Sequence, residues 1–292
     1  MLSGSEVAAA HTEMWVIEPR RHGAFSRLRE LWSYRYLWWY FASETIVSLY
    51  RGSMLGWLWL LLRVVAPVGL NALVFGGIFD LQTKVQHVPY FLFFLSGTIT
   101  WTLFERSLVY VTRSLERNRK LVTRVYFPRL ILPMSAIAPG LMYLVILLIV
   151  LAITVVGFHQ RTGVWYVLFT PRLFVSAGAV VASLMLVIGV GLWTSVLQAR
   201  YRDVRYALRY VTPFWFLLTP VVYPMSVIHD KYPWLVAINP MAPIVEAFRW
   251  GTIGGDQFQV VPAAISFGIL VVTMVTGLWY FNREEAASVD KL

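Results

Sequence analysis

The sequence contains no cysteine among its 292 residues. Disulfide bonds, thiolate metal sites and thiol-based catalysis are therefore excluded. Charged residues are also scarce, because they make up 14% of the chain, against roughly 25% in an average soluble domain. Hydrophobic residues reach 58%, where such a domain has roughly 45–50%. This composition indicates a membrane protein.

The sequence motifs of common enzymes are missing as well. No G-x-x-x-x-G-K-[ST] phosphate-binding loop occurs, so ATP binding by that loop is excluded. Neither H-E-x-x-H nor G-x-S-x-G is present, and the five histidines are isolated in the sequence. The few carboxylates form no pair whose spacing indicates an acid/base role. We therefore expect no catalytic residue, no metal site and no cofactor in this chain.

Long charge-free runs predict the membrane-spanning helices, since about 20 apolar residues cross a bilayer. The first run reaches this length only when it is extended back past Arg63 to Leu58. The sequence thus predicts an all-α protein with six transmembrane helices, at 64–79, 85–104, 130–158, 173–199, 210–228 and 257–282.

Basic residues predict the orientation of these helices. Lys and Arg gather before the first span, between spans 2 and 3, between spans 4 and 5, and after span 6. Because cytoplasmic loops collect positive charge, both termini are expected in the cytoplasm. The net charge of +10 then reflects topology, and no nucleic-acid partner is expected.

Two segments precede the first span. Residues 1–23 are small, polar and charged, which argues against a cleavable signal peptide and predicts a flexible cytoplasmic tail. Residues 24–50 are expected to form an amphipathic helix in the membrane interface, followed by the transmembrane domain at 51–292. Its apolar stripe recurs every three or four positions, at Phe25, Leu28, Trp32, Tyr36 and Trp39. A soluble helix packed on a partner is the alternative.

The loop between spans 2 and 3 is basic and short. Its sequence, RSLERNRKLVTRVYFPR (113–129), predicts a cytoplasmic helix of about three turns that ends before Pro128. A solvated basic loop fits nearly as well. Tyr126 and Phe127 beside the basic run favour a surface on which a partner docks.

The segment between spans 5 and 6 contains a helix-start pattern in INPMAPIVEAFRWGTIGG (238–255). Asn239 is suited to cap a helix in which Pro240 takes the first position. Glu246 and Arg249 then lie three residues apart on one face. We expect a short helix on the outer side of the membrane.

Aromatic and intramembrane charged residues are the remaining features. The chain has 13 Trp, 15 Tyr and 18 Phe, which interfacial belts and helix packing explain in part. A pore whose flat rings let sugars slide past is the alternative. Glu105 and Arg106, near the end of span 2, are functional candidates inside the membrane, although a structural ion pair is equally consistent.

Four stretches together resemble the permease subunits of type-2 ABC exporters of lipid-linked polysaccharides, such as O-antigen, capsule and teichoic acid. They are LYRGSMLGWLWLLLRVVAP (49–67), LVTRVYFPRLILP (121–133), ARYRDVRYALRYVTPFWFLLTPVVYP (199–224) and INPMAPIVEAFRWGTIGG (238–255). The resemblance implies a homodimer in the inner membrane, joined to two separate P-loop ATPase subunits that bind ATP and Mg²⁺.

The resemblance also implies roles for individual segments. A coupling helix at 113–126 would contact the ATPase through Arg113, Glu116, Arg117, Arg119, Lys120, Arg124 and Tyr126. An outer gate at 226–255 would use Tyr232, Trp234, Asn239, Pro240, Glu246 and Arg249. The substrate path between spans 1 and 5 would be lined by Trp57, Trp59, Trp101, Phe104, Phe214, Trp215, Phe216 and Tyr223.

The expected substrate is a polyprenyl-pyrophosphate-linked polysaccharide. Its head would be guided by guanidinium groups, for which the candidates are Arg51, Arg63, Arg202 and Arg205. Topology and binding of anionic membrane lipids are the alternative explanation of these arginines. Two other functions stay open at this point. One is a type-2 exporter of teichoic acid, a small lipid or a drug, and the other is a membrane-embedded polyprenyl-sugar transferase with Asp203 beside Arg202 and Arg205.

Overall fold

The computed structural model describes residues 31–79, 88–122, 127–167, 170–229, 232–254 and 259–284. Within these ranges all regular structure is helical, which confirms the predicted class. The elements are α2 (Arg35–Val47), α3 (Leu58–Leu73), the π-helical turn η2 (Val74–Ile78), α4 (Tyr90–Thr112), α5 (Ser114–Arg117), α6 (Arg119–Val122), α7 (Ile131–Ser135), α8 (Ala138–Thr162), α9 (Leu173–Arg200), α10 (Val204–Leu218), α11 (Met225–His229), α12 (Pro233–Ile238), α13 (Met241–Ile253) and α14 (Val260–Glu284).

Four helical segments in the described part of the chain are long and apolar enough to cross a membrane. They are Leu58–Ile78, Ile131–Thr162, Leu173–Arg200 and Val260–Glu284. These segments correspond to the first, third, fourth and sixth predicted spans. The second and fifth differ from the sequence expectation, so that a total of six passes stays a prediction.

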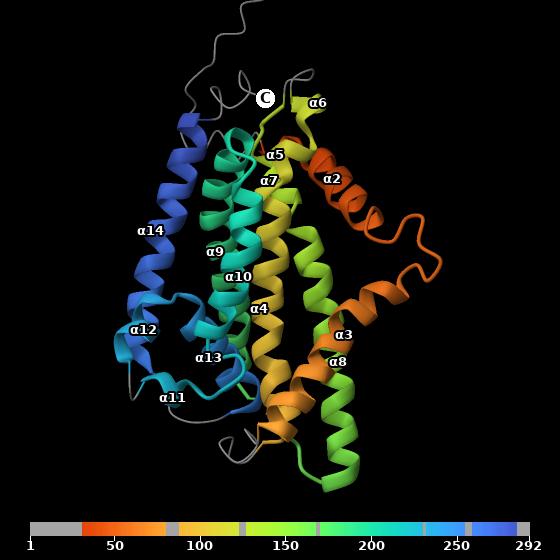
Figure 1. The fold of residues 1–292 in the computed structure, drawn as a ribbon, viewed down its shortest axis with the longest axis vertical. Coiled ribbons are helices and arrows are strands. Elements are labelled where there is room, and N and C mark those ends of the chain that lie inside the picture. The colour runs from red at the N-terminus through yellow and green to blue at the C-terminus, as the bar shows by residue number, and fades with distance from the viewer. Residues whose placement is uncertain are drawn as a thin grey trace, which may run out of the picture.

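Helix α4 takes the place of the second predicted span and lies at the centre of the bundle (Figure 1). It continues to Thr112, beyond the predicted end at residue 104 and past Glu105 and Arg106. Most of its side chains are buried, because α3, α8, α9, α10 and α13 all pack against it. A helix enclosed in this way has protein rather than lipid as its surroundings, and it tolerates threonines, serines and charges.

Helix α10 takes the place of the fifth predicted span and is shorter than expected. The prediction of one span over 210–228 is wrong, because the helix ends at Leu218. Thr219 has an extended conformation with ψ 134°, as expected of a residue before a proline, here Pro220. The helix also begins earlier than the predicted span, at Val204, so that it includes Arg205 and Arg209.

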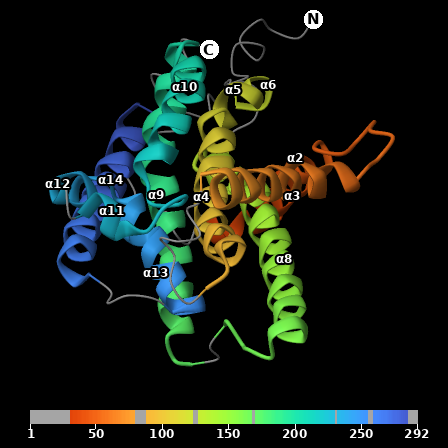
Figure 2. The same ribbon diagram turned by 60° about the horizontal axis from the view of Figure 1, so that its bottom comes forward.

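The short helices gather at the two ends of the bundle (Figures 1 and 2). Helices α2, α5, α6 and α7 lie at one end, together with the junction of α9 and α10, whereas α11, α12 and α13 lie at the other. The segments with the predicted cytoplasmic charges are therefore on one side of the molecule. Which side faces the cytoplasm stays a prediction from the charge distribution.

Helix α2 packs on the bundle by one face only. Phe41 is buried beside Phe127, with ring centroids 6.0 Å apart, in a cluster that also includes Leu192 of α9. Tyr36 and Trp39 of α2, together with Trp32 just before it, have 77%, 67% and 74% of their surface exposed. The interfacial helix over 24–50 stays a prediction, as does its alternative of a helix packed on a partner, and residues 24–30 lie outside the described part of the chain.

The predicted coupling helix is divided in the structure. Helices α5 and α6 have four residues each and are separated at Asn118, which leaves the helical conformation at ψ 19°. The side chain of Asn118 donates a hydrogen bond to the Ser114 carbonyl at 2.9 Å. The expectation of one continuous helix of three turns is therefore wrong over the described residues. Residues 123–126, with Arg124 and Tyr126, lie outside them.

Helices α9 and α14 approach each other closely where two glycines meet. A Cβ atom added to Gly189 would lie 2.8 Å from the backbone nitrogen of Met274, and one added to Gly277 would meet the carbonyl oxygen of Gly189. Such small residues are the usual means of close helix packing in membranes, where burial of apolar surface contributes little. This crossing fixes α14 against the bundle.

Replacing Gly189 by alanine tests this crossing. The variant is expected to lose about 1–3 kcal/mol, since the backbone of α14 must move. Gly178→Ala, in the same helix, is the matched control because no atom lies within 4 Å of the added Cβ. It should be neutral or stabilise by about 0.5–1 kcal/mol through helix propensity. Thermal unfolding of both variants in one detergent provides the measurement, and equal stabilities would contradict the packing account.

Candidate functional site

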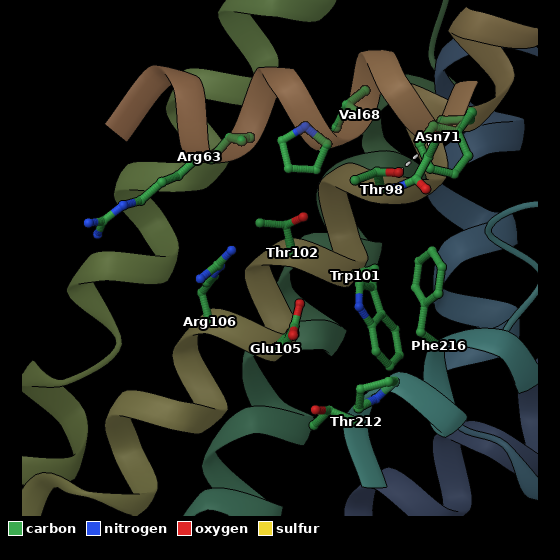
Figure 3. Close-up of a pocket in the computed structure, with 14 residues that line it drawn as sticks. Arg63, Val68, Asn71, Thr98, Trp101, Thr102, Glu105, Arg106, Thr212 and Phe216 are labelled. Atoms are coloured by element: carbon green, nitrogen blue, oxygen red, sulfur yellow. Dashed lines mark hydrogen bonds between the residues drawn. The ribbon is translucent and has the colours of Figure 1, made fainter. Parts of the chain in front are cut away.

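A partly open cavity of about 250 Å³ lies between α3, α4 and α10 (Figure 3). Helix α4 lies between the other two and supplies the largest group of lining residues. The cavity is lined by Arg63, Val64, Pro67, Val68 and Asn71 of α3, by Phe94, Thr98, Trp101, Thr102, Glu105 and Arg106 of α4, and by Thr212, Pro213 and Phe216 of α10. We call this cavity the groove.

Two prolines inside helices line the groove, Pro67 in α3 and Pro213 in α10. Each lacks an N–H, so the carbonyl four residues earlier, of Arg63 or Arg209, has no helical donor. Backbone irregularity at membrane depth is tolerated where it lines a cavity or is covered by protein. The position of the prolines therefore fits a path through the membrane better than a surface that faces lipid.

Only two of the eight predicted aromatic residues line the groove, Trp101 and Phe216, with ring centroids 5.4 Å apart. Phe104 and Trp215 pack behind them at 4.9 Å and belong to the contact between α4 and α10. Trp215 also donates its indole N–H to Asn239 at 2.8 Å. The structure thus gives Phe104 and Trp215 a packing role.

The other four predicted lining residues lie outside the groove. Trp57 and Phe214 are 67% and 69% exposed, and Trp59 is 41% exposed. Tyr223 follows α10, and its hydroxyl donates to the carbonyl of Leu217. None of these four touches the cavity in a single copy of the chain.

The four predicted phosphate-binding arginines do not lie together in the structure. Arg63 lines the groove, whereas Arg51 is exposed in the turn between α2 and α3. Arg202 is exposed before α10, and Arg205 stacks on the ring of Tyr206 at 4.9 Å. The structure brings Arg106 to the groove instead, a residue that the sequence indicated only as an intramembrane charge.

A buried arginine organises the opposite end of the bundle. Arg249 of α13 is only 3% exposed, and it forms the predicted pair with Glu246 at 2.9 Å. Its Nη2 atom also donates to the carbonyls of Pro220 and Val221, at 3.0 and 3.1 Å. Burial lowers the pKa of the Arg249 guanidinium, while Glu246 raises it. The ion pair therefore offsets part of the cost of burying the charge.

Helix α4 supplies the space for this guanidinium. Its carbon atom lies 3.7 Å from the centre of the Phe93 ring. A Cβ atom on Gly97 would be 2.5 Å from Nη2 of Arg249 and 3.3 Å from the backbone of Val221. A glycine at this position leaves room for the arginine between α4 and the end of α10.

Asn239 and Tyr90 satisfy further backbone groups after α10. Asn239 accepts a hydrogen bond from the Met241 N–H at 3.1 Å, so the predicted capping role is confirmed although α13 begins one residue later than expected. Its amide donates to the Leu218 carbonyl at 3.2 Å. The Tyr90 hydroxyl donates to the Val222 carbonyl at 2.7 Å. We call Tyr90, Asn239, Glu246 and Arg249 the outer latch.

A protein-family model for the ABC-2 type transporter matches residues 21–253, which include the groove and all four residues of the outer latch. The chain belongs to this family. This match confirms the resemblance seen in the four sequence stretches. The chain is therefore an ABC-2 permease.

Three curated relatives of this ABC-2 permease carry one name, O-antigen export system permease protein RfbA. The protein from Myxococcus xanthus is 28% identical over 225 residues, which are 76% of this chain and 82% of the relative. Two proteins from Klebsiella pneumoniae are each 25% identical, over 234 and 236 residues. Each of these alignments covers 80% of this chain and 86% of the relative.

The predicted coupling residues of the ABC-2 permease lie at the end of the bundle that carries α2. Arg117 lies 3.6 Å from Glu44 of α2 and donates to the Ser48 hydroxyl at 2.9 Å. Glu116 accepts a hydrogen bond from Gln198 of α9 at 3.0 Å. The remaining described members surround these two on or beside α5 and α6, namely Arg113, Arg119 and Lys120.

The predicted gate residues of the ABC-2 permease fall into two groups. Asn239, Glu246 and Arg249 belong to the outer latch, and Pro240 directly precedes α13. Tyr232 and Trp234, at the start of α12, are 54% and 60% exposed. The sequence pattern therefore located the segment, while the hydrogen bonds to α10 are visible only in the structure.

Replacing Arg249 by methionine tests the outer latch. The change leaves two buried carbonyls without this donor and Glu246 without its partner, so a loss of about 3–5 kcal/mol is expected. Arg172→Met is the control, because Arg172 is exposed and only stacks on Trp250 at 4.8 Å. Thermal unfolding in detergent compares the two variants. If both melt at the same temperature, the latch does not hold the end of α10.

Proposed function

We propose that this ABC-2 permease is the transmembrane subunit of an ATP-driven exporter for a polyprenyl-pyrophosphate-linked polysaccharide. The substrate would leave the cytoplasm across the inner membrane, in which both termini of the chain face the cytoplasm. The names of the curated relatives support the O-antigen-like substrate class. The structural observation that carries the proposal is the groove, which combines charged groups with aromatic rings.

A second copy of the chain would complete the path. On α10, Tyr206, Tyr210 and Phe214 recur every four residues and are 50%, 69% and 69% exposed. They form one helical face that does not pack on α4. In the proposed homodimer this face lies toward the path and the second copy, so that sugars move past aromatic rings from both subunits.

Two P-loop ATPase subunits would dock at the end formed by α2, α5 and α6. ATP and Mg²⁺ would bind to these partners. The contacts of Arg117 with Glu44 and Ser48 join α5 to α2, which leads through the turn at residues 48–57 into α3. Because the ion pair is partly exposed, its energy is small. In the proposal the contact matters for its position and not for its energy, because it would pass a movement of α5 to α3, one wall of the groove.

The outer helices α11, α12 and α13 would act as the gate. The outer latch ties α13, and Asn239 at the end of α12, to the end of α10, which is the other wall of the groove. A displacement of α10 is therefore linked to the gate as well. The alternative function is export of another substrate, namely teichoic acid, a small lipid or a drug.

A strain that lacks its own O-antigen permease tests the substrate class. The chain, expressed with the ATPase encoded beside it, is expected to restore surface polysaccharide, measured by immunoblot of extracted lipopolysaccharide. A catalytically inactive ATPase should abolish the restoration. If the chain restores teichoic acid export in a strain deficient in that polymer but does not restore O-antigen export, the proposed substrate class is wrong and teichoic acid takes its place.

The aromatic lining is tested by Phe216→Ala. Because Phe216 faces the groove, export should fall several-fold while the amount of permease in the membrane stays constant. Phe267→Ala is the matched control, since Phe267 is 60% exposed on α14 and does not line the groove. Surface polysaccharide per permease molecule is measured for both. Equal export would exclude Phe216 from the path.

A further inference from the structure

The two arginines of the groove have no ion-pair partner among the described residues. Arg63 and Arg106 form no ion pair and no hydrogen bond with the described residues, and Nε of Arg106 is buried without a partner. Each guanidinium is instead placed near an aromatic ring, at 5.9 Å from Trp59 and 5.3 Å from Tyr143. Such contacts hold a cation in position without neutralising it.

Both arginines lie toward the helix ends that connect to α2 and α5, which are on the proposed cytoplasmic side. Arg63 lies five residues after the start of α3, and Arg106 lies six residues before the end of α4. At 1.5 Å per residue, both are about 8–9 Å from the end of their helices. A lipid-linked substrate would enter from this end of the bundle under the proposed orientation.

The groove also separates its charges from its rings. In Figure 3 the guanidinium groups of Arg63 and Arg106 lie toward one side of the cavity, and Trp101 and Phe216 lie toward the other. A ligand with an anionic end followed by a sugar would place each part against a suitable surface. Guanidinium groups bind phosphate oxygens in a fork, and aromatic faces pack against apolar faces of sugar rings.

We propose that Arg63 and Arg106 bind the diphosphate of a lipid head group, and that Glu105 limits the affinity of this site. This inference rests on the proposed export of a lipid-linked substrate. Glu105 lines the same cavity and also lacks an ion pair among the described residues, so its carboxylate repels a bound phosphate. A transport site must bind strongly enough to be entered and weakly enough to be left. The Glu105 carboxylate would keep binding weak enough for the lipid head group to leave.

The test measures binding of radiolabelled farnesyl diphosphate to the full chain in phosphatidylcholine nanodiscs. The wild-type protein should bind it, and farnesol should not compete. Arg63→Gln and Arg106→Gln should each weaken binding roughly tenfold or more through loss of a charge-assisted contact. Glu105→Gln should tighten it several-fold. A gain of affinity cannot result from misfolding, so this variant keeps the test decisive if Arg106→Gln is unstable.

Two matched controls lie outside the groove. Arg283→Gln removes another exposed arginine stacked on a tryptophan, at 5.4 Å from Trp279, and Asp203→Asn removes an exposed carboxylate. Neither should change binding. Equal weakening by Arg283→Gln, or unchanged affinity in Glu105→Gln, would overturn the site. Competition by phosphatidylglycerol as strong as that by unlabelled farnesyl diphosphate would also overturn it, in favour of an ordinary membrane-lipid site.

Export by the complete transporter separates this site from the proposed function. If wild-type export is intact and the three substitutions change neither binding nor export, the site is wrong and the function stands. If farnesyl diphosphate binds as expected but the transporter exports no lipid-linked polymer, the function is wrong and the anion site stands. In Glu105→Gln, tighter binding should be accompanied by a lower maximal export rate.

Discussion

The backbone that follows α10 needs hydrogen-bond donors, and the buried side chain of Arg249 supplies them. Thr219 and Pro220 end the helix inside the bundle, so the carbonyls from Leu217 to Val222 lose their helical partners. Water is scarce at this depth, and unsatisfied carbonyls are costly there. Arg249, Asn239, Tyr90 and Tyr223 each donate to one or more of them. Side chains from α4 and from the outer helices therefore stabilise a short α10.

This constraint connects the two ends of the molecule. Because α10 is held at its outer end and lies on α4, its remaining face is available for a second copy, and the side chains of Thr212 and Phe216 reach the groove. At the other end, Arg117 joins α5 to α2 and thereby to the start of α3. The groove thus lies between one wall tied to the proposed ATPase side and another tied to the proposed gate.

The sequence was sufficient for the class, for four of the apolar spans and for the capped helix α13, because these depend on local composition and spacing. It was insufficient for the bounds of α4 and α10. Predicting a helix from a charge-free run takes for granted that lipid surrounds the helix. Helix α4 is instead enclosed by protein and continues past Glu105. Whether Trp101 or Trp215 faces a cavity depends on how α10 is rotated on α4, and the grouping of Arg63 with Arg106 depends on the packing of α3. Neither the rotation of α10 nor the packing of α3 can be predicted from the pattern of a single sequence.

The central claim is that the exposed face of α10 lines a path between two copies of the chain. Since the natural sequence has no cysteine, a single Phe214→Cys substitution carries one spin label per copy in the complete transporter. Electron–electron double resonance then measures the distance between the two labels. The account predicts a shorter distance than for labels at Phe267→Cys on α14, an exposed position that does not line the groove. A distance at position 214 equal to or longer than that at position 267 would contradict it.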